Sequence, residues 1–390
     1  AEITKQLILT KGFTVIAAEA DWPDAYQVNR YLMGETTIKE ARQALGKFQR
    51  FPQWMWRNRE VLKFIQWLAA YNQQQAEPDK VGFYGLDLYS LHSSMQAVIE
   101  YLMMVDPEAA AQARQRYACF EHFHDPQDYG YVASRDLSQS CEQAVIDQLV
   151  ALRNQSFAYL HHNHQALDQY FYAEQNARLA KHAEQYYRLM FDPKISTWNL
   201  RDQHMFETLE NLYQFHSEKK GEAVKIVVWA HNSHVGDARA TEQASSGELN
   251  LGQLVRENYA SDCYLLGFAT YTGTVVAADN WGEPLQLKRV TPALYHSYEY
   301  LLHQLGLKHF LLLFRGNKLL AELLREPRLQ RAIGVIYRPA TERLSHYYSV
   351  RLPEQFDAVI YWDKTQGLIP LDAPYDFPPD ELPETYPSGF

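Results

Sequence analysis

The chain has 390 residues, of which 46% are hydrophobic and 22% are charged, as in ordinary soluble globular proteins. Its 37 lysines and arginines face 47 aspartates and glutamates, so the net charge is −10 and the pI is about 5.8. This excess of negative charge argues against binding to nucleic acids or to anionic membranes through a positively charged surface. No apolar run approaches the roughly 18 residues that are needed to cross a bilayer.

The chain begins with helical spacing. Apolar residues over 1–11 recur at helical intervals, Gly12 suits the C-terminal end of a helix, and a strand-like run follows over 13–18. A parallel sheet normally supplies a strand before such a helix, and the loop after that strand borders the same cleft. We therefore expect the chain to open within a βαβ unit, with part of the site upstream.

Carboxylates follow two strand-like runs in the first part of the chain. Glu19 follows the run over 13–18, and Asp87 follows the run over 81–86. Open α/β sheets place ligand sites beyond the carboxyl ends of their strands. Glu19 and Asp87 are therefore candidate site residues, although Asp87 could equally cap the end of its strand.

The middle of the chain has a different pattern. Residues 90–221 show long helical periodicity with few β-branched clusters, most clearly over 176–190. This predicts a helical lobe inserted into an α/β core that comprises 1–89 and 222–371. Residues 372–390 are rich in Pro, Asp and Glu, which indicates an irregular tail.

Histidines end the next strand-like run. The strand-like run over 225–230 stops at His231, and His234 follows three residues later. Together, the alternating strand-like and helical segments predict an α/β fold with a mostly parallel sheet flanked by helices. The remaining strand-like runs are 264–270, 309–314, 333–337 and 356–362.

A metal site is a weaker interpretation of these histidines. His231 and His234 could form half of a site, with Glu19 or Asp87 as further ligands, but no His-Glu-x-x-His helix is present. Neither a Gly-x-Ser-x-Gly elbow nor a phosphate or dinucleotide motif occurs. We expect no metal and no cofactor. The histidine clusters at 122–124 and 161–164 are interpreted as solvated helix or loop positions.

Two further features concern packing and compartment. Trp54, Trp56 and Arg57 could line a broad cleft or form the packing seam between core and lobe, and the tryptophan spacing favours packing. The three cysteines are widely spaced, so neither a disulfide framework nor a thiolate metal site is indicated, and a reducing cytoplasm is the simplest compartment.

Several segments together carry a family resemblance. They resemble, in order and along essentially the whole chain, the erythromycin esterase family. The segments are Glu19–Pro23, Val28–Tyr31, Phe51–Asn58, Tyr84–Leu88, Trp198–Met205, Trp229–His234 and Phe356–Val359.

The resemblance implies hydrolysis of a macrolide lactone ester without a serine nucleophile. In that family, a Gly-Glu-x-x-His-Gly motif supplies the histidine that activates water, supported by a downstream glutamate and two later histidines. By position, Glu19 matches the glutamate, and His231 and His234 match the histidines. The Gly-Glu-x-x-His-Gly motif does not occur within residues 1–390, and the resemblance places it just upstream of the first helix.

These residue types suit ester hydrolysis. Direct attack by water needs a base, a group that orients the base, and a donor that faces the carbonyl oxygen. We expect Glu19, His231 and His234 to be catalytic, with Trp22, Asp87 and Arg57 binding substrate or supporting them. Outside catalysis, Glu19 and His231 would serve as caps or buried hydrogen-bonding groups, and His234 would brace the loop.

The function predicted is that of a cytoplasmic esterase acting on a small-molecule ester, with relevance to macrolide antibiotic resistance. The alternative is a non-catalytic module of a longer protein that keeps the fold and binds a ligand in the cleft. The sequence leaves the natural substrate and the oligomeric state open.

Overall fold

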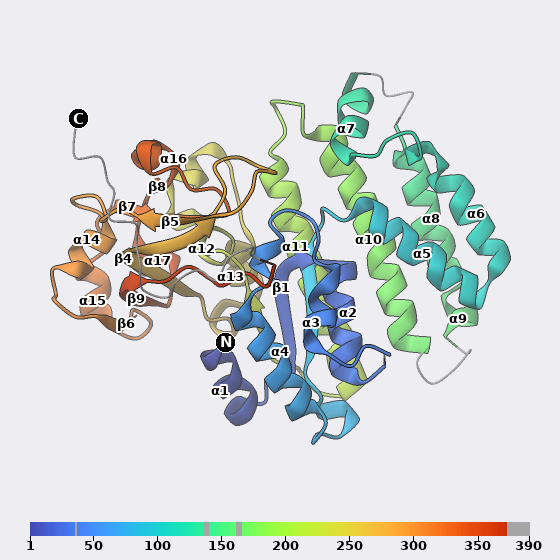
Figure 1. The fold of residues 1–390 in the computed structure, drawn as a ribbon, viewed down its shortest axis with the longest axis horizontal. Coiled ribbons are helices and arrows are strands. Elements are labelled where there is room, and N and C mark those ends of the chain that lie inside the picture. Colours follow the sequence, from blue (N-terminus) through green and yellow to red (C-terminus); the bar gives the residue numbers. More distant parts are fainter. Residues whose placement is uncertain (36, 136–139, 161–165, 373–390) are drawn as a thin grey trace.

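The computed structural model describes residues 1–35, 37–135, 140–160 and 166–372 of a mixed α/β protein (Figure 1). A parallel sheet lies near the centre, helices α5 to α10 lie on one side of it, and a second sheet lies on the other. None of the helices in these ranges is long and apolar enough to span a membrane. The predicted tail beyond Asp372 and the histidines at 161–164 lie outside the described residues.

The strands are β1 Val15–Asp21, β2 Gly82–Asp87, β3 Ile226–Trp229, β4 Leu266–Ala277, β5 Gln286–Val290, β6 His309–Leu313, β7 Arg328–Arg331, β8 Tyr347–Val350 and β9 Ala358–Thr365. The helices are α1 Glu2–Lys11, α2 Trp22–Met33, α3 Ala41–Ala44, α4 Arg59–Asn72, α5 Leu91–Val105, α6 Pro107–Tyr117, α7 Pro126–Arg135, α8 Glu142–Asn154, α9 Ser156–Tyr159, α10 Ala166–Leu189, α11 Thr197–Lys220, α12 Asn232–Val235, α13 Leu251–Tyr259, α14 Tyr298–His303, α15 Lys318–Leu323, α16 Glu342–Ser345 and α17 Leu352–Gln355.

The central sheet has the order β2-β1-β3, and both strand pairs are parallel. Side chains of β1 alternate between two cores: Ile16 and Ala18 pack with α2 and α4, whereas Val15 and Ala17 pack with the helices that follow β2. All three strands end at the same edge because they run in the same direction. The sheet thus brings together residues that are distant in sequence.

A glycine lets β2 approach the end of β1. A Cβ atom on Gly85 would lie 2.4 Å from the backbone oxygen of Ala20 and 2.7 Å from the backbone of Asp21. Only glycine fits such a close approach without a shift of the backbone. The contact holds the ends of β1 and β2 together, just where the carboxylates project.

The segment between β2 and β3 consists, in its described residues, of helices and loops without a strand. The long helix α10 includes the predicted helical stretch at 176–190, and it packs against α5, α7, α8 and α11. The exact boundaries of the predicted lobe stay a prediction.

A disulfide within this helical segment departs from the sequence-based expectation. Cys119 and Cys141 are bonded, with Cα atoms 6.1 Å apart and a sequence separation of 22. Their spacing carried no signal because the turn from α6 to α8 brings them together. Disulfides are rare in the cytosol, so this bond does not support the expected reducing compartment.

The expectation of one mostly parallel sheet is not confirmed. The second sheet has the order β5-β4-β9-β6, in which only β4 and β9 are parallel, and β7 and β8 form a separate antiparallel pair. The predicted strand at 333–337 is a loop with one isolated bridge, between Ile336 and Ala278. Its apolar residues reflect packing instead, since Val335 contacts a cluster formed by Trp54 and Val276.

Candidate functional site

The three strand ends of the central sheet converge on one arginine of α11. Arg201 donates from Nε and Nη2 to the two carboxylate oxygens of Asp87, at 2.9 and 2.7 Å. Nη2 also donates to Oε1 of Glu19 at 2.7 Å. The other Glu19 oxygen accepts from the backbone N–H of His231 at 2.9 Å. Glu19, Asp87 and His231, predicted to lie together, are thus joined directly or through Arg201.

This network holds both carboxylates ionised. Burial alone would raise the pKa of Asp87, but the guanidinium of Arg201 outweighs it and lowers that pKa. Burial likewise opposes ionisation of Glu19, whose pKa is nevertheless lowered by His234 and Arg201. The side chain of Glu19 keeps 20% of its exposure, against 5% for Asp87. Glu19 is therefore the carboxylate of this pair that a ligand can reach more readily.

His234 lies next to Glu19, and its side chain is almost fully buried. Its Nδ1 donates to the carboxylate of Asp202 at 2.9 Å, and its Nε2 lies 3.4 Å from Glu19 and 3.0 Å from Arg201. Burial disfavours the charged ring, but Glu19 and Asp202 raise the pKa of His234 above its ordinary value. The ring stacks on Trp198 with centroids 4.4 Å apart. His234 thus positions Glu19 from the protein side.

His231 is held at the start of α12. Its Nδ1 accepts from Ser233, at 2.8 Å from the hydroxyl and 3.3 Å from the backbone N–H, which caps this short helix. Because Nδ1 accepts, Nε2 carries the proton and donates to the backbone oxygen of Ile333 at 3.0 Å. Burial lowers the pKa of His231, which favours the neutral ring at pH 7. The ring therefore presents a neutral N–H donor to a carbonyl oxygen.

The imidazoles and carboxylates of the site are engaged in hydrogen bonds with one another and with nearby protein groups. The nitrogens of both histidines are directed at protein groups, and the ranges that the structure describes contain no group of three or more His, Cys, Asp or Glu able to hold a metal ion. A carboxylate that accepts and an imidazole that donates face the same strand edge. Such a pair can orient a water and polarise a carbonyl.

Two of the predicted supporting residues lie outside this cluster. Trp22 is 2% exposed and stacks between Tyr84 and Tyr172, so it joins the strand to the helical segment. Arg57 donates to the carboxylate of Asp372 at 2.8 Å and also contacts the oxygen of Phe48, which ties down the end of the described chain. Within the part of the chain that the structure describes, neither side chain has a hydrogen bond to Glu19 or His231.

The tryptophans near Arg57 serve packing, but they pack against the two sheets and not, as predicted, between the core and the helical lobe. Trp54 is 4% exposed within a cluster that includes Val276. The indole N–H of Trp56 donates to the backbone oxygen of Glu19 at 3.1 Å. Trp56 therefore braces β1 at the site through the backbone.

Sequence reasoning missed the two residues of α11 that organise the site, Arg201 and Asp202. Both lie within the segment Trp198–Met205, which was one of the segments that carried the family resemblance. No pattern around them indicated a role, because α11 reads as an ordinary helix in the middle of the helical segment. The family resemblance of this segment was therefore the one feature of the sequence that could have pointed to Arg201 and Asp202.

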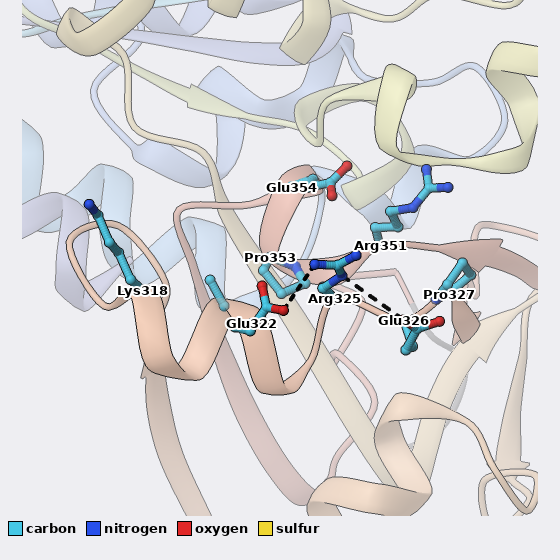
Figure 2. Close-up of a pocket in the computed structure, with 9 residues that line it drawn as sticks. Lys318, Glu322, Arg325, Glu326, Pro327, Arg351, Pro353 and Glu354 are labelled. Atoms are coloured by element: carbon cyan, nitrogen blue, oxygen red, sulfur yellow. Dashed lines mark hydrogen bonds and ion pairs between the residues drawn. The ribbon is translucent and has the colours of Figure 1, made fainter.

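A pocket of about 650 Å³ lies elsewhere, between α15 and α17 (Figure 2). Its wall carries both signs of charge, and Arg325 lies 2.9 Å from Glu322 and 4.0 Å from Glu326. None of the candidate site residues lines it. The exposed, paired charges are those of a solvated surface, and we assign this pocket no part in the site.

A pair of histidines on α10 and α11, of which His204 is buried and His182 partly buried, predicts a loss of stability in acid. The Nδ1 atoms of His182 and His204 lie 2.8 Å apart, and burial lowers the pKa of His182 to about 2 and that of His204 to about 4. Between pH 6.5 and 4, these two histidines bind protons in the unfolded chain but not in the folded chain. The free energy of unfolding therefore falls as the pH falls.

The expected loss is about 1 kcal/mol per histidine for each pH unit below 6.5. Urea unfolding at pH 7.0, 6.0 and 5.0 measures it. In His204→Gln the difference between pH 7.0 and 5.0 should shrink by about 1–2 kcal/mol. The control is Gln214→Ala, an exposed position on α11 without a titratable group, which should leave the pH dependence unchanged. An identical pH dependence in wild type and His204→Gln would contradict the assignment.

Comparisons with known proteins agree with this fold. The family model described as erythromycin esterase matches residues 8–365. A solved structure described as a succinoglycan biosynthesis protein is 22% identical, with a TM-score of 0.74, over 94% of this chain and 83% of that one. A protein from Bacillus cereus is 19% identical, with a TM-score of 0.76, over 95% and 85%. A histidine-to-asparagine mutant of the erythromycin esterase EreC, in its open conformation, is 18% identical, with a TM-score of 0.60, over 93% and 85%.

Proposed function

Because the chain belongs to the erythromycin esterase family, we propose that it hydrolyses a carboxylic ester, a macrolide lactone or another large ester, with water as the nucleophile. The observation that carries this proposal is the hydrogen bond from the backbone N–H of His231 to Glu19, which places an ionised carboxylate beside an imidazole that already donates to the backbone oxygen of Ile333. A backbone carbonyl and an ester carbonyl offer the same kind of acceptor. When substrate binds, the carbonyl oxygen of the ester would replace the backbone oxygen of Ile333 as the acceptor for Nε2 of His231.

The roles of the three groups follow from their contacts. His231 donates to the carbonyl oxygen as negative charge develops there, and Glu19, ionised and partly exposed, accepts a hydrogen bond from the attacking water. His234, held by Asp202, keeps the carboxylate of Glu19 in position. By the family resemblance, the proton of the water would go to the histidine of a Gly-Glu-x-x-His-Gly motif, which residues 1–390 do not contain.

Isotope labelling tests the nucleophile. With enzyme in excess over ester in ¹⁸O water, a single turnover should place the label in the product acid, because water attacks without an acyl-enzyme. Serine-directed fluorophosphonates should leave the rate unchanged, and chelators should have little effect. Unlabelled acid after one turnover would show attack by an enzyme oxygen. Activity lost to a chelator and restored by one metal would recast Glu19, His231 and His234 as ligands.

A non-catalytic ligand-binding module is the second candidate. It is favoured by the engagement of both ring nitrogens of His231 with protein groups, as expected if the residue only braces α12. A protein that binds an ester and returns it intact would support this alternative. Mass spectrometry of the bound ligand after overnight incubation distinguishes the two.

A further inference from the structure

An exposed tryptophan stands at the tip of the β4–β5 hairpin. Trp281 is 52% exposed, although indole is a large apolar ring. Its centroid lies 4.8 Å from that of Phe51 and 6.4 Å from that of Tyr89. The hairpin belongs to the second sheet, whereas Phe51 and Tyr89 belong to the part of the chain around the central sheet (Figure 1). The tip therefore reaches across to the strand ends.

The position of Trp281 is held by its surroundings. The turn closes with a hydrogen bond from the backbone N–H of Glu283 to the oxygen of Asn280, at 3.2 Å. Arg338 donates to the backbone oxygen of Asp279 at 2.8 Å. The ring of Trp281 is thus presented by an ordered turn, and little conformational entropy remains to be lost when a ligand covers it.

Tyr89 connects this aromatic surface to the candidate site. It follows Asp87 by two residues, and the guanidinium carbon of Arg201 lies 5.0 Å from its ring centroid. Arg50 lies 4.7 Å from the same centroid, but both oxygens of Asp21 pair with it, at 2.8 and 3.0 Å. The charge of Arg50 is therefore balanced, and the surface suits an uncharged ligand.

From this geometry we propose that Phe51, Tyr89 and Trp281 form an aromatic subsite, which binds a planar, uncharged ring of the ester substrate. The proposal rests on the proposed function for the reacting end of the substrate. A ring stacked on Trp281 buries apolar surface on both partners, and aromatic pairs add to that burial. The chain of contacts from Trp281 through Tyr89 and Arg201 to Glu19 places the subsite beside the ester. The subsite selects which esters are held.

Two esters with similar leaving groups test the selection. They are 2-naphthylmethyl acetate, whose ring is planar, and cyclohexylmethyl acetate, whose ring is not. Trp281→Ala should raise KM for the naphthylmethyl ester about tenfold with kcat within about twofold, and it should leave the cyclohexylmethyl ester nearly unchanged. Trp281→Phe should recover most of the loss. The matched control is Trp362→Ala, because Trp362 is 46% exposed on β9.

A binding measurement separates the subsite from the reaction. Calorimetry with N-(2-naphthylmethyl)acetamide, which resists hydrolysis, should show about tenfold weaker binding to Trp281→Ala than to wild type. If wild type hydrolyses neither these esters nor a macrolide lactone but this loss of binding is found, the subsite stands and the proposed function fails. Equal KM and equal affinity in wild type and Trp281→Ala, equal losses in Trp362→Ala, or no binding of the amide to wild type would each overturn the subsite.

Discussion

His231→Ala is expected to lower kcat for ester hydrolysis by about 10²- to 10³-fold, the usual loss when one donor to a developing oxyanion is removed. The neutral ring now donates from Nε2 to a carbonyl oxygen, and alanine offers no donor at this place. The variant should still fold. The cost is the cap of a four-residue helix, about 1 kcal/mol. Steady-state kinetics and urea unfolding measure the two effects.

A second substitution separates donation from acid–base chemistry at this position. Glutamine offers a neutral N–H donor but cannot exchange a proton near pH 7. If His231 acts as a donor, His231→Gln should recover part of the rate lost in His231→Ala. The exposed His309→Ala is the control and should keep wild-type kinetics. Wild-type turnover in folded His231→Ala would remove this residue from the mechanism.

Arg201→Met is expected to destabilise the protein by about 3–5 kcal/mol, the typical cost of breaking a buried ion pair from one side. Methionine fills much of the volume of the arginine stem but cannot pair with Asp87 or Glu19. Both carboxylates would stay near the strand ends without their cation, and Asp87 is only 5% exposed. Equilibrium urea unfolding at pH 7 measures the loss.

Removing the orphaned charge should reverse part of that loss. In Arg201→Met with Asp87→Asn, the amide has no charge to desolvate, so the double variant should be more stable than Arg201→Met alone. The control is Arg325→Met, whose ion pair with Glu322 is exposed and should contribute less than about 1 kcal/mol. Equal stabilities of Arg201→Met and Arg325→Met would refute the assigned role of Arg201.

The placement of Glu19, Asp87 and His231 could be predicted from the chain alone. Each follows a short apolar run, and parallel strands that share a direction must end at one edge of their sheet. The helix over residues 2–11 and its end at Gly12 were equally accessible, because helical spacing and a glycine in the left-handed region, with φ 69°, are local signals. These features depend only on neighbours within a few residues.

Tertiary structure alone decided the features that depend on distant partners. Arg201 meets Glu19 across 182 residues, and the same helix carries Asp202 to His234. The division into separate sheets and the pairing of Cys119 with Cys141 likewise left no mark in local spacing. The partners of an ion pair and the neighbours of a strand depend on which surfaces pack together in the folded protein. Local periodicity indicates only whether a residue is buried or exposed. The sequence by itself therefore determined that Glu19, Asp87 and His231 lie at the ends of the strands. Tertiary packing determined that Arg201 is the residue that joins the two carboxylates.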